Sequence, residues 1–122
     1  MKNSTEKGNW GGDMPKLTQV PPANIRISEI ILQLSKAQRE KLIAGYDLKN
    51  FARIFEDEDT MSTVDNFLKY GMNVSETARM LYMHRNTLIY RLNKIQSVTG
   101  LDIRVFDMAV TFEILRSLYE LK

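Results

Sequence analysis

The sequence predicts an all-α fold, a multi-helix domain, and three features of the chain support this. Glycine and proline, the strongest breakers of helices, number only six and three among 122 residues. The Asn-Gly and Asp-Gly pairs that typify tight β-hairpins do not occur. From Ile27 onward, apolar residues recur at intervals of three and four, which is the spacing of one helix face.

The composition narrows the class of protein. With 43% hydrophobic and 26% charged residues, the chain matches an average globular domain with its own core. The absence of cysteine excludes disulfides, thiolate metal sites and thiol nucleophiles. No apolar run is long enough to cross a bilayer, and the amino terminus lacks the apolar stretch of a signal peptide. We therefore expect a cytoplasmic protein with no membrane partner.

The amino-terminal region differs from the rest of the chain. Residues 1–25 are rich in Asn, Gly, Lys and Pro, show no helical periodicity, and reach Pro21-Pro22 near their end. We interpret them as a flexible arm, either a tail or a linker from a further domain.

Helices are expected throughout residues 26–59, which we interpret as a linker or dimerisation region. The first helix begins at Ile27. Ser35 offers an N-cap for a second helix, and Gln38 three residues later completes a capping box. Gly45 is expected to end this helix. The apolar face of the first helix comprises Ile27, Ile30, Ile31 and Leu34.

A third and a fourth helix follow in the same way. Asp47 can cap the third helix. The acidic residues 56–59 suit a connection into the first turn of the fourth, because negative charge is favourable at a helix N-terminus. Gly71 is expected to end this helix. The inward-facing residues are predicted to be Leu48, Phe51, Ala52 and Phe55 in the third helix and Met61, Val64, Phe67 and Leu68 in the fourth.

Residues 60–122 are predicted to contain a helix-turn-helix. Ser75 can cap a short helix that reaches Tyr82, and a longer helix spans about 85–98 and ends before Gly100. Such a motif packs one face of its second helix and places the other in the DNA major groove. The residues expected to hold the two helices in register are Thr77, Ala78, Leu81, Met83, Leu88, Leu92 and Ile95.

The outer face of the longer helix has the chemistry of a DNA-reading surface. Between Ser75 and Ser97, four cationic residues stand against the single acid Glu76, a net charge of about +3 in a chain whose total is +2. Arginine can bind guanine through two hydrogen bonds, and asparagine can do so with adenine. The principal DNA contacts are predicted to be Arg85, Asn86, Thr87, Tyr90 and Lys94, with His84, Ile89, Arg91 and Asn93 as secondary contacts. His84 is also expected to cap this helix.

The last helix is expected from about Phe106 to Leu121, with apolar residues around much of its circumference. One small domain rarely covers both sides of such a helix, whereas a second copy of the chain could do so. We therefore predict a homodimer. The apolar residues are Phe106, Ala109, Val110, Phe112, Ile114, Leu115, Leu118, Tyr119 and Leu121.

A family resemblance strengthens the helix-turn-helix interpretation. Three short motifs closely resemble the carboxy-terminal domain of PucR/CdaR-type regulators. They are His-Arg-Asn-Thr-Leu at His84–Leu88, Tyr-Arg-Leu at Tyr90–Leu92 and Thr-Gly-Leu-Asp at Thr99–Asp102. These bacterial purine-catabolism and sugar-diacid regulators have a Fis-like helix-turn-helix. The resemblance implies a bacterial transcription regulator whose output domain binds duplex DNA. It also implies that any effector is bound by a domain not present in this chain.

Other functions remain possible from the sequence. A helical protein-interaction or dimerisation module would have the same periodicity, and the DNA-binding part of a transposase or recombinase would have the same motif. An enzyme is not expected, because no phosphate loop or nucleophile motif is present. No cofactor or metal is expected either: His84 is the only histidine, and Asp57 and Asp59 lack the glycine and terminal glutamate of an EF-hand.

Overall fold

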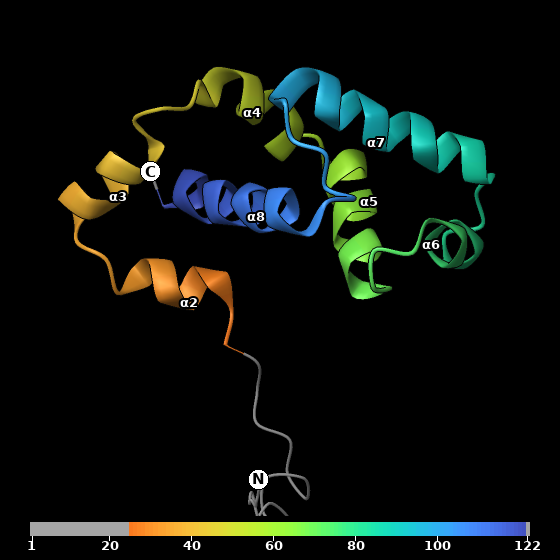
Figure 1. Cartoon of the computed structure of the whole chain (residues 1–122), viewed down its shortest axis with the longest axis horizontal. Coiled ribbons are helices and arrows are strands. Elements are labelled where there is room, and N and C mark those ends of the chain that lie inside the picture. Colours follow the sequence, from red (N-terminus) through yellow and green to blue (C-terminus); the bar gives the residue numbers. More distant parts are fainter. Residues whose placement is uncertain (1–24, 122) are drawn as a thin grey trace, which may run out of the picture.

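The computed structural model describes residues 25–121, and helices are the only regular secondary structure in this part of the chain, as predicted. Most of the predicted arm, residues 1–24, lies outside the described residues. Helix α8 lies centrally, with α2 and α3 at one end of the molecule and α6 and α7 towards the other (Figure 1). The helices are α2 (Ile27–Leu32), α3 (Lys36–Ile43), α4 (Leu48–Phe55), α5 (Glu58–Lys69), α6 (Val74–Met80), α7 (Arg85–Thr99) and α8 (Phe106–Glu120).

Local capping signals set several of these boundaries. Ser35 and Gln38 form the predicted capping box: the Gln38 amide donates to Ser35 Oγ at 3.1 Å, and the Ser35 amide donates to Gln38 Oε1 at 2.8 Å. Asp47 caps α4 by accepting a hydrogen bond from the Lys49 amide at 3.1 Å. Ala44 is the C-cap of α3, and Gly45 follows it without adopting a left-handed backbone.

Three predicted boundaries were wrong. Helix α2 ends at Leu32, although Leu34 still packs against the core beyond the helix end. Helix α6 ends at Met80, before Tyr82, and it is capped by Asn73 instead of Ser75. The Asn73 side chain accepts a hydrogen bond from the Glu76 amide at 2.7 Å. The preceding turn explains this position, because two of the three residues that link α5 to Asn73, Gly71 and Met72, have left-handed backbones with φ of 71° and 62°.

Two groups of buried side chains form the core. The first fills the space among α4, α5, α6, α7 and α8, and it includes the fully buried Phe67, Leu92 and Phe112. The second lies where α2 and α4 meet α8, and it comprises Ile31, Phe51, Leu115 and Leu118. Two partly buried residues, Phe55 and Leu101, pack against both groups. Helix α4 thus connects the amino-terminal helices to the helix-turn-helix.

The predicted set of inward-facing residues in α4 and α5 was incomplete. Ile54 is buried in the first group although the periodicity did not single it out, whereas Leu48, Ala52 and Phe55 are only partly buried. In α5, Met61, Val64 and Phe67 are buried as predicted, and Leu68 is partly buried. Thr63 is also buried there. A polar residue in the core carries no apolar signal, so its burial could not be read from periodicity.

An ionic cluster connects α8 to α5. Arg116 donates to both carboxylate oxygens of Asp65, the shorter bond being 2.6 Å. Its guanidinium also lies 3.7 Å from Glu113 and 3.6 Å from Glu120. Burial raises the pKa of Glu113, and the nearby Arg116 offsets only part of this shift. Oε2 of Glu113 is buried without a hydrogen-bond partner among the described residues, because 3.7 Å is too long for such a bond.

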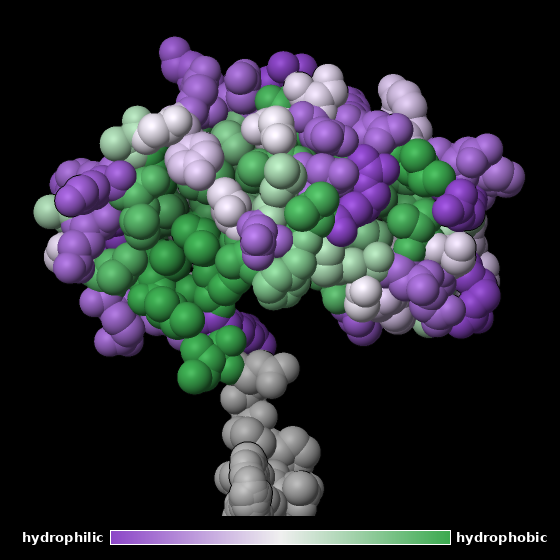
Figure 2. Space-filling model, in the orientation of Figure 1, coloured by the Kyte–Doolittle hydropathy of each residue, from purple (hydrophilic) through white to green (hydrophobic). Residues whose placement is uncertain are grey.

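The surroundings of α8 change the basis of the dimer prediction. Helices α2, α3 and α4 all pack against α8, so much of its apolar circumference is covered within one chain. Phe106 and Met108 near its start and Leu121 beyond its end remain exposed. A hydrophobic surface nevertheless extends over α2 and the carboxy-terminal half of α8 (Figure 2).

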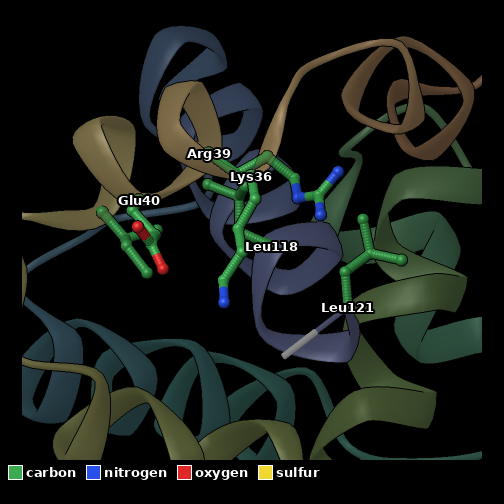
Figure 3. A pocket seen from close by; sticks show the side chains of 6 residues that line it. Lys36, Arg39, Glu40, Leu118 and Leu121 are labelled. Carbon is green, nitrogen blue, oxygen red and sulfur yellow. The ribbon is translucent and has the colours of Figure 1, made fainter.

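A pocket of about 320 Å³ lies between α3 and the end of α8. The side chains of Lys36, Arg39 and Glu40 from α3 and of Leu118 and Leu121 face it (Figure 3). None of its lining residues belongs to α6 or α7. The pocket is therefore separate from the predicted DNA-binding residues.

Candidate nucleic-acid interface

Helices α6 and α7 are joined by a tight turn of four residues, 81–84. Tyr82 has a left-handed backbone with φ of 54°, and its side chain is 97% exposed. Glycine is favoured at such a position, since other residues are strained by about 1–2 kcal/mol there. Met83 follows, its amide donating to the carbonyl of Ala78 at 3.0 Å while its side chain packs against the core. The turn thus brings α7 directly back onto α6.

The side chains predicted to hold the two helices in register lie on their inner faces. Five are buried: Thr77, Ala78, Leu88, Leu92 and Ile95. Leu81 and Met83 are partly buried. Oγ1 of Thr77 has no hydrogen-bond partner among the described residues. In α7, the buried residues Leu88, Leu92 and Ile95 all lie on one side of the helix, so its opposite side does not pack against the core.

His84 is the N-cap of α7, as expected. Its Nδ1 accepts a hydrogen bond from the Asn86 amide at 3.0 Å. An accepting Nδ1 carries no proton, so in the neutral imidazole the proton resides on Nε2. The exposed His84 ring therefore retains one N–H donor that the cap does not use.

The outer face of α7 is polar and accessible. Arg85 and Asn86 in its first turn are exposed, as are Thr87, Tyr90, Asn93 and Lys94. Ile89 is partly buried. The helix carries no acidic residue along its 15 positions. Within residues 25–121, Arg85 forms no ion pair or side-chain hydrogen bond, so its guanidinium is available to an external acceptor.

Arg91 is engaged within the protein. Its Nη1 donates to Oγ1 of Thr63 on α5 at 2.9 Å, and that hydroxyl in turn donates to the carbonyl of Asp59. Arg91 is partly buried and lies near the inner edge of the helix. These bonds fix α7 relative to α5, and they occupy a residue that the sequence suggested as a secondary DNA contact.

Lys94 lies beside acidic residues. Together with Thr87, Tyr90 and Arg91, it lines a groove of about 370 Å³ that also contains Asp57 and Asp59 from the start of α5. The pKa of Asp57 is lowered, chiefly by hydrogen bonds from Thr60 and to a smaller extent by the charge of Lys94. The two acids weaken the positive field on this side of α7, whereas Arg85 lies outside the groove.

The structure adds a residue that the sequence analysis missed. Arg104, between α7 and α8, donates from Nη2 to Oδ1 of Asn93 at 2.8 Å and to Oε1 of Gln96 at 3.1 Å. It thereby reaches the outer side of α7 from beyond the motif. Local spacing gave no signal for this contact, because it depends on how the chain turns after Gly100.

Two other features bear on the class of site. In the part of the chain that the structure describes, no three acidic or histidine side chains are grouped so that they could hold a metal ion. None of the seven described helices is both long and apolar enough to span a bilayer.

Comparison with known proteins agrees with this geometry. Residues 60–115 match the family model of the PucR C-terminal helix-turn-helix domain. The chain is 41% identical over 49 residues to the purine catabolism regulatory protein of Bacillus subtilis (strain 168), a match that covers 40% of this chain and 9% of that protein. It is 42% identical over 45 residues to the carbohydrate diacid regulator of Escherichia coli (strain K12), covering 37% of this chain and 12% of the relative.

A solved structure is also similar. It is the regulator of polyketide synthase expression from Bifidobacterium adolescentis, with a TM-score of 0.52 and 30% sequence identity. The similarity covers 76% of this chain and 35% of that protein. The family-model match includes the helix-turn-helix. The chain spans 9%, 12% and 35% of the lengths of these three relatives. The helix-turn-helix of this chain is therefore similar to the PucR C-terminal helix-turn-helix domain, whose family model matches residues 60–115.

Proposed function

We propose that this chain binds duplex DNA sequence-specifically, as the output domain of a bacterial transcriptional regulator in the cytoplasm, with α7 in the major groove. The observation that carries the proposal is the outer face of α7. It is exposed, polar and free of acidic residues, and it lies opposite a buried stripe that fixes the helix on α6. A recognition helix requires this division between an inner and an outer face.

The first turn of α7 supports base reading. Arg85 and Asn86 are exposed at the amino-terminal end, which is the part of a recognition helix that contacts base edges. Arg85 can donate two hydrogen bonds to guanine, and Asn86 can form two with adenine. Thr87, Tyr90 and the free Nε2–H of His84 suit phosphate oxygens, because each offers a donor beside this turn.

Arg91 and Lys94, which interact with other side chains of the protein, are assigned smaller roles in DNA binding. Arg91 is bonded to Thr63, and Lys94 shares its groove with Asp57 and Asp59. We expect both to contribute less than Arg85 to DNA affinity.

The curated relatives are named as regulators, and the matched segment is about a tenth of their length. Effector binding is therefore assigned to a domain outside this chain, and the family points to regulation instead of catalysis.

DNA binding can be tested by fluorescence anisotropy. A duplex selected from a random pool by the wild-type chain is labelled and titrated at low and moderate salt. Arg85→Ala is expected to weaken binding by about 1–3 kcal/mol and to relax the base preference at one position. Lys41→Ala is the matched control, since it removes one positive charge from an exposed position on α3. We expect it to bind like the wild type.

Two results would contradict the proposal. If the folded wild-type chain binds no duplex even at low salt, the protein-interaction module becomes the better interpretation. If Arg85→Ala and Lys41→Ala weaken binding equally and without changing base preference, α7 is not the reading helix, because only general charge would then matter.

We also propose that the chain acts as a homodimer through the outward side of α2. This helix is apolar around most of its circumference: Ile31 is buried against α8, whereas Ile30 and Leu32 are 54% and 58% exposed. Such a helix is typical of one that is covered on both sides. A second copy suits this face because Glu29 is the only charged residue of α2, so two copies could pack with little repulsion. A two-fold dimer would present two α7 helices to two half-sites.

Sedimentation equilibrium tests the dimer. Ile30→Glu is expected to convert a dimeric chain into a monomer, because it places charge in the proposed contact. Phe106→Glu, at the exposed start of α8, is the control and should leave the dimer intact. A wild-type chain that is monomeric at tens of micromolar, or a dimer lost only in Phe106→Glu, would rule out this face.

A further inference from the structure

We infer that Arg104 is a positioning residue for DNA binding: it orients the side-chain amides of Asn93 and Gln96 so that both present N–H donors to the DNA backbone. The inference rests on the proposed function, because it concerns the same helix. It extends the interface beyond the motif to the segment that joins α7 to α8. The juxtaposition that carries it is one guanidinium bonded to two exposed amides of α7.

Arg104 is itself held in place. Asp102 Oδ1 accepts from Arg104 Nε at 2.7 Å and from the Arg104 backbone amide at 3.0 Å. The side chains of this pair are only 26% and 21% exposed, so solvent competes weakly for these bonds. A guanidinium anchored through Nε has little freedom left. Its Nη2 therefore points at a defined place on α7.

The bonds to α7 determine how the two amides are oriented. Nη2 of Arg104 donates to Oδ1 of Asn93 and to Oε1 of Gln96. A guanidinium can only donate hydrogen bonds, so each amide must turn its oxygen towards Arg104. The amide nitrogens then face away from the guanidinium. Because Asn93 and Gln96 are exposed and three residues apart on one helix, their NH₂ groups form a pair of donors on one side of α7.

This orientation restricts what the two residues can bind. An asparagine reads adenine with its oxygen and its nitrogen together. The oxygen of Asn93 is turned towards Arg104 and accepts a hydrogen bond from it, so Asn93 is less suited than Asn86 to the paired contact with adenine. Only acceptors suit the remaining NH₂ groups. Phosphate oxygens are the acceptors that fit, because Asn93 and Gln96 lie in the carboxy-terminal half of α7, away from the end that contacts bases.

The same geometry predicts how Arg104 affects binding. Neutral amide donors displace no counterions from DNA, so losing their alignment lowers affinity without changing its salt dependence. An arginine that contacted phosphate itself would behave differently, because its removal would lower the slope of log K against log salt by about one. The salt slope therefore separates positioning from direct contact.

The experiment uses Arg104→Gln and Asp102→Asn in the full chain, with the duplex selected by the wild type. Arg104→Gln is expected to lower affinity about tenfold, evenly across sequences and with an unchanged salt slope. Asp102→Asn is the sharper variant. It removes a negative charge near the interface, which by charge alone would raise affinity, yet it loosens Arg104 and is therefore expected to lower it. Thermal melting followed by circular dichroism shows whether each variant remains folded.

A double-mutant cycle completes the test. In an Asn93→Ala/Gln96→Ala background, Arg104→Gln is expected to have no further effect, because the groups that it orients are gone. An additive loss, or a fall of about one in the salt slope, would mean that Arg104 contacts DNA directly. Unchanged affinity in both folded single variants would assign Arg104 to stability alone. Each of these results leaves wild-type binding intact, so it is distinct from failure of the proposed function.

Discussion

A fragment of residues 60–122 is expected to lose its cooperative thermal unfolding transition, whereas a fragment of residues 46–122 should retain one. The difference between them contains α4. Ile54 on α4 is 3% exposed and belongs to the same buried group as the helix-turn-helix residues. Phe51 on α4 packs beneath α8. The family match begins at residue 60, but the core beneath the motif begins earlier.

The magnitude follows from the side chains that would be lost. The Phe55 ring centroid lies 5.3 Å from that of Phe112 and 5.3 Å from that of Tyr119, and Phe51 packs on Phe55 at 5.8 Å. Truncating one such core residue costs about 2–5 kcal/mol. Removing all of α4 therefore approaches the total stability of a small domain, about 5–15 kcal/mol. The face of α8 around Leu115 would also become exposed to water.

Circular dichroism at 222 nm during heating measures this effect. The 46–122 fragment is the control, because it lacks α2 and α3 but keeps α4 and the first buried group. It is expected to melt cooperatively at a lower temperature than the full chain. A cooperative transition in the 60–122 fragment near that of the full chain would show that α4 is dispensable. The division at residue 60 would then describe a folding unit, which the packing of Ile54 argues against.

Much of the fold could be predicted because its signals are local. Apolar spacing and good capping residues, such as Ser35, Asp47 and His84, act within a few residues of the boundaries that they set. Where two good caps lie close together, the sequence does not decide between them. Asn73 caps α6 instead of Ser75 because the turn through Gly71 and Met72 brings the chain into register two residues earlier.

The parts of the site that were missed depend on contacts between distant residues. The sequence predicted Arg91 as a secondary DNA contact, but the packing of α5 supplies Thr63 as its partner, 28 residues away. Arg104 lies outside the motif, and its bond to Asn93 requires the turn at Gly100 and the anchor at Asp102. Periodicity assigns a residue to a face. It does not say which other segment already occupies that residue's hydrogen-bonding groups.

Phe112→Ala is expected to lower the free energy of unfolding by about 3–5 kcal/mol, because it removes a large aromatic ring from the centre of the core. The Phe112 side chain is fully buried in the first group, and Phe55 meets it edge-on with an interplanar angle of 72°. Alanine would leave a cavity beneath α4 and α8, and the edge-to-face contact would be lost as well. The Phe112 ring therefore stabilises both the helix-turn-helix and α4, which completes the core beneath it.

Phe106→Ala is the matched control, since it is the same substitution in the same helix at a side chain that is 68% exposed. Its effect should stay within about 0.5 kcal/mol, as for other surface positions. Urea denaturation compares the two variants, with the slope m checked for constancy so that a shift in midpoint reports stability. Equal midpoints for the two variants would contradict the burial of Phe112. If the midpoints differ as expected, Phe112→Ala should still bind the selected duplex at low temperature, because the outer face of α7 is unchanged. On heating, the variant should lose binding as its folded fraction falls.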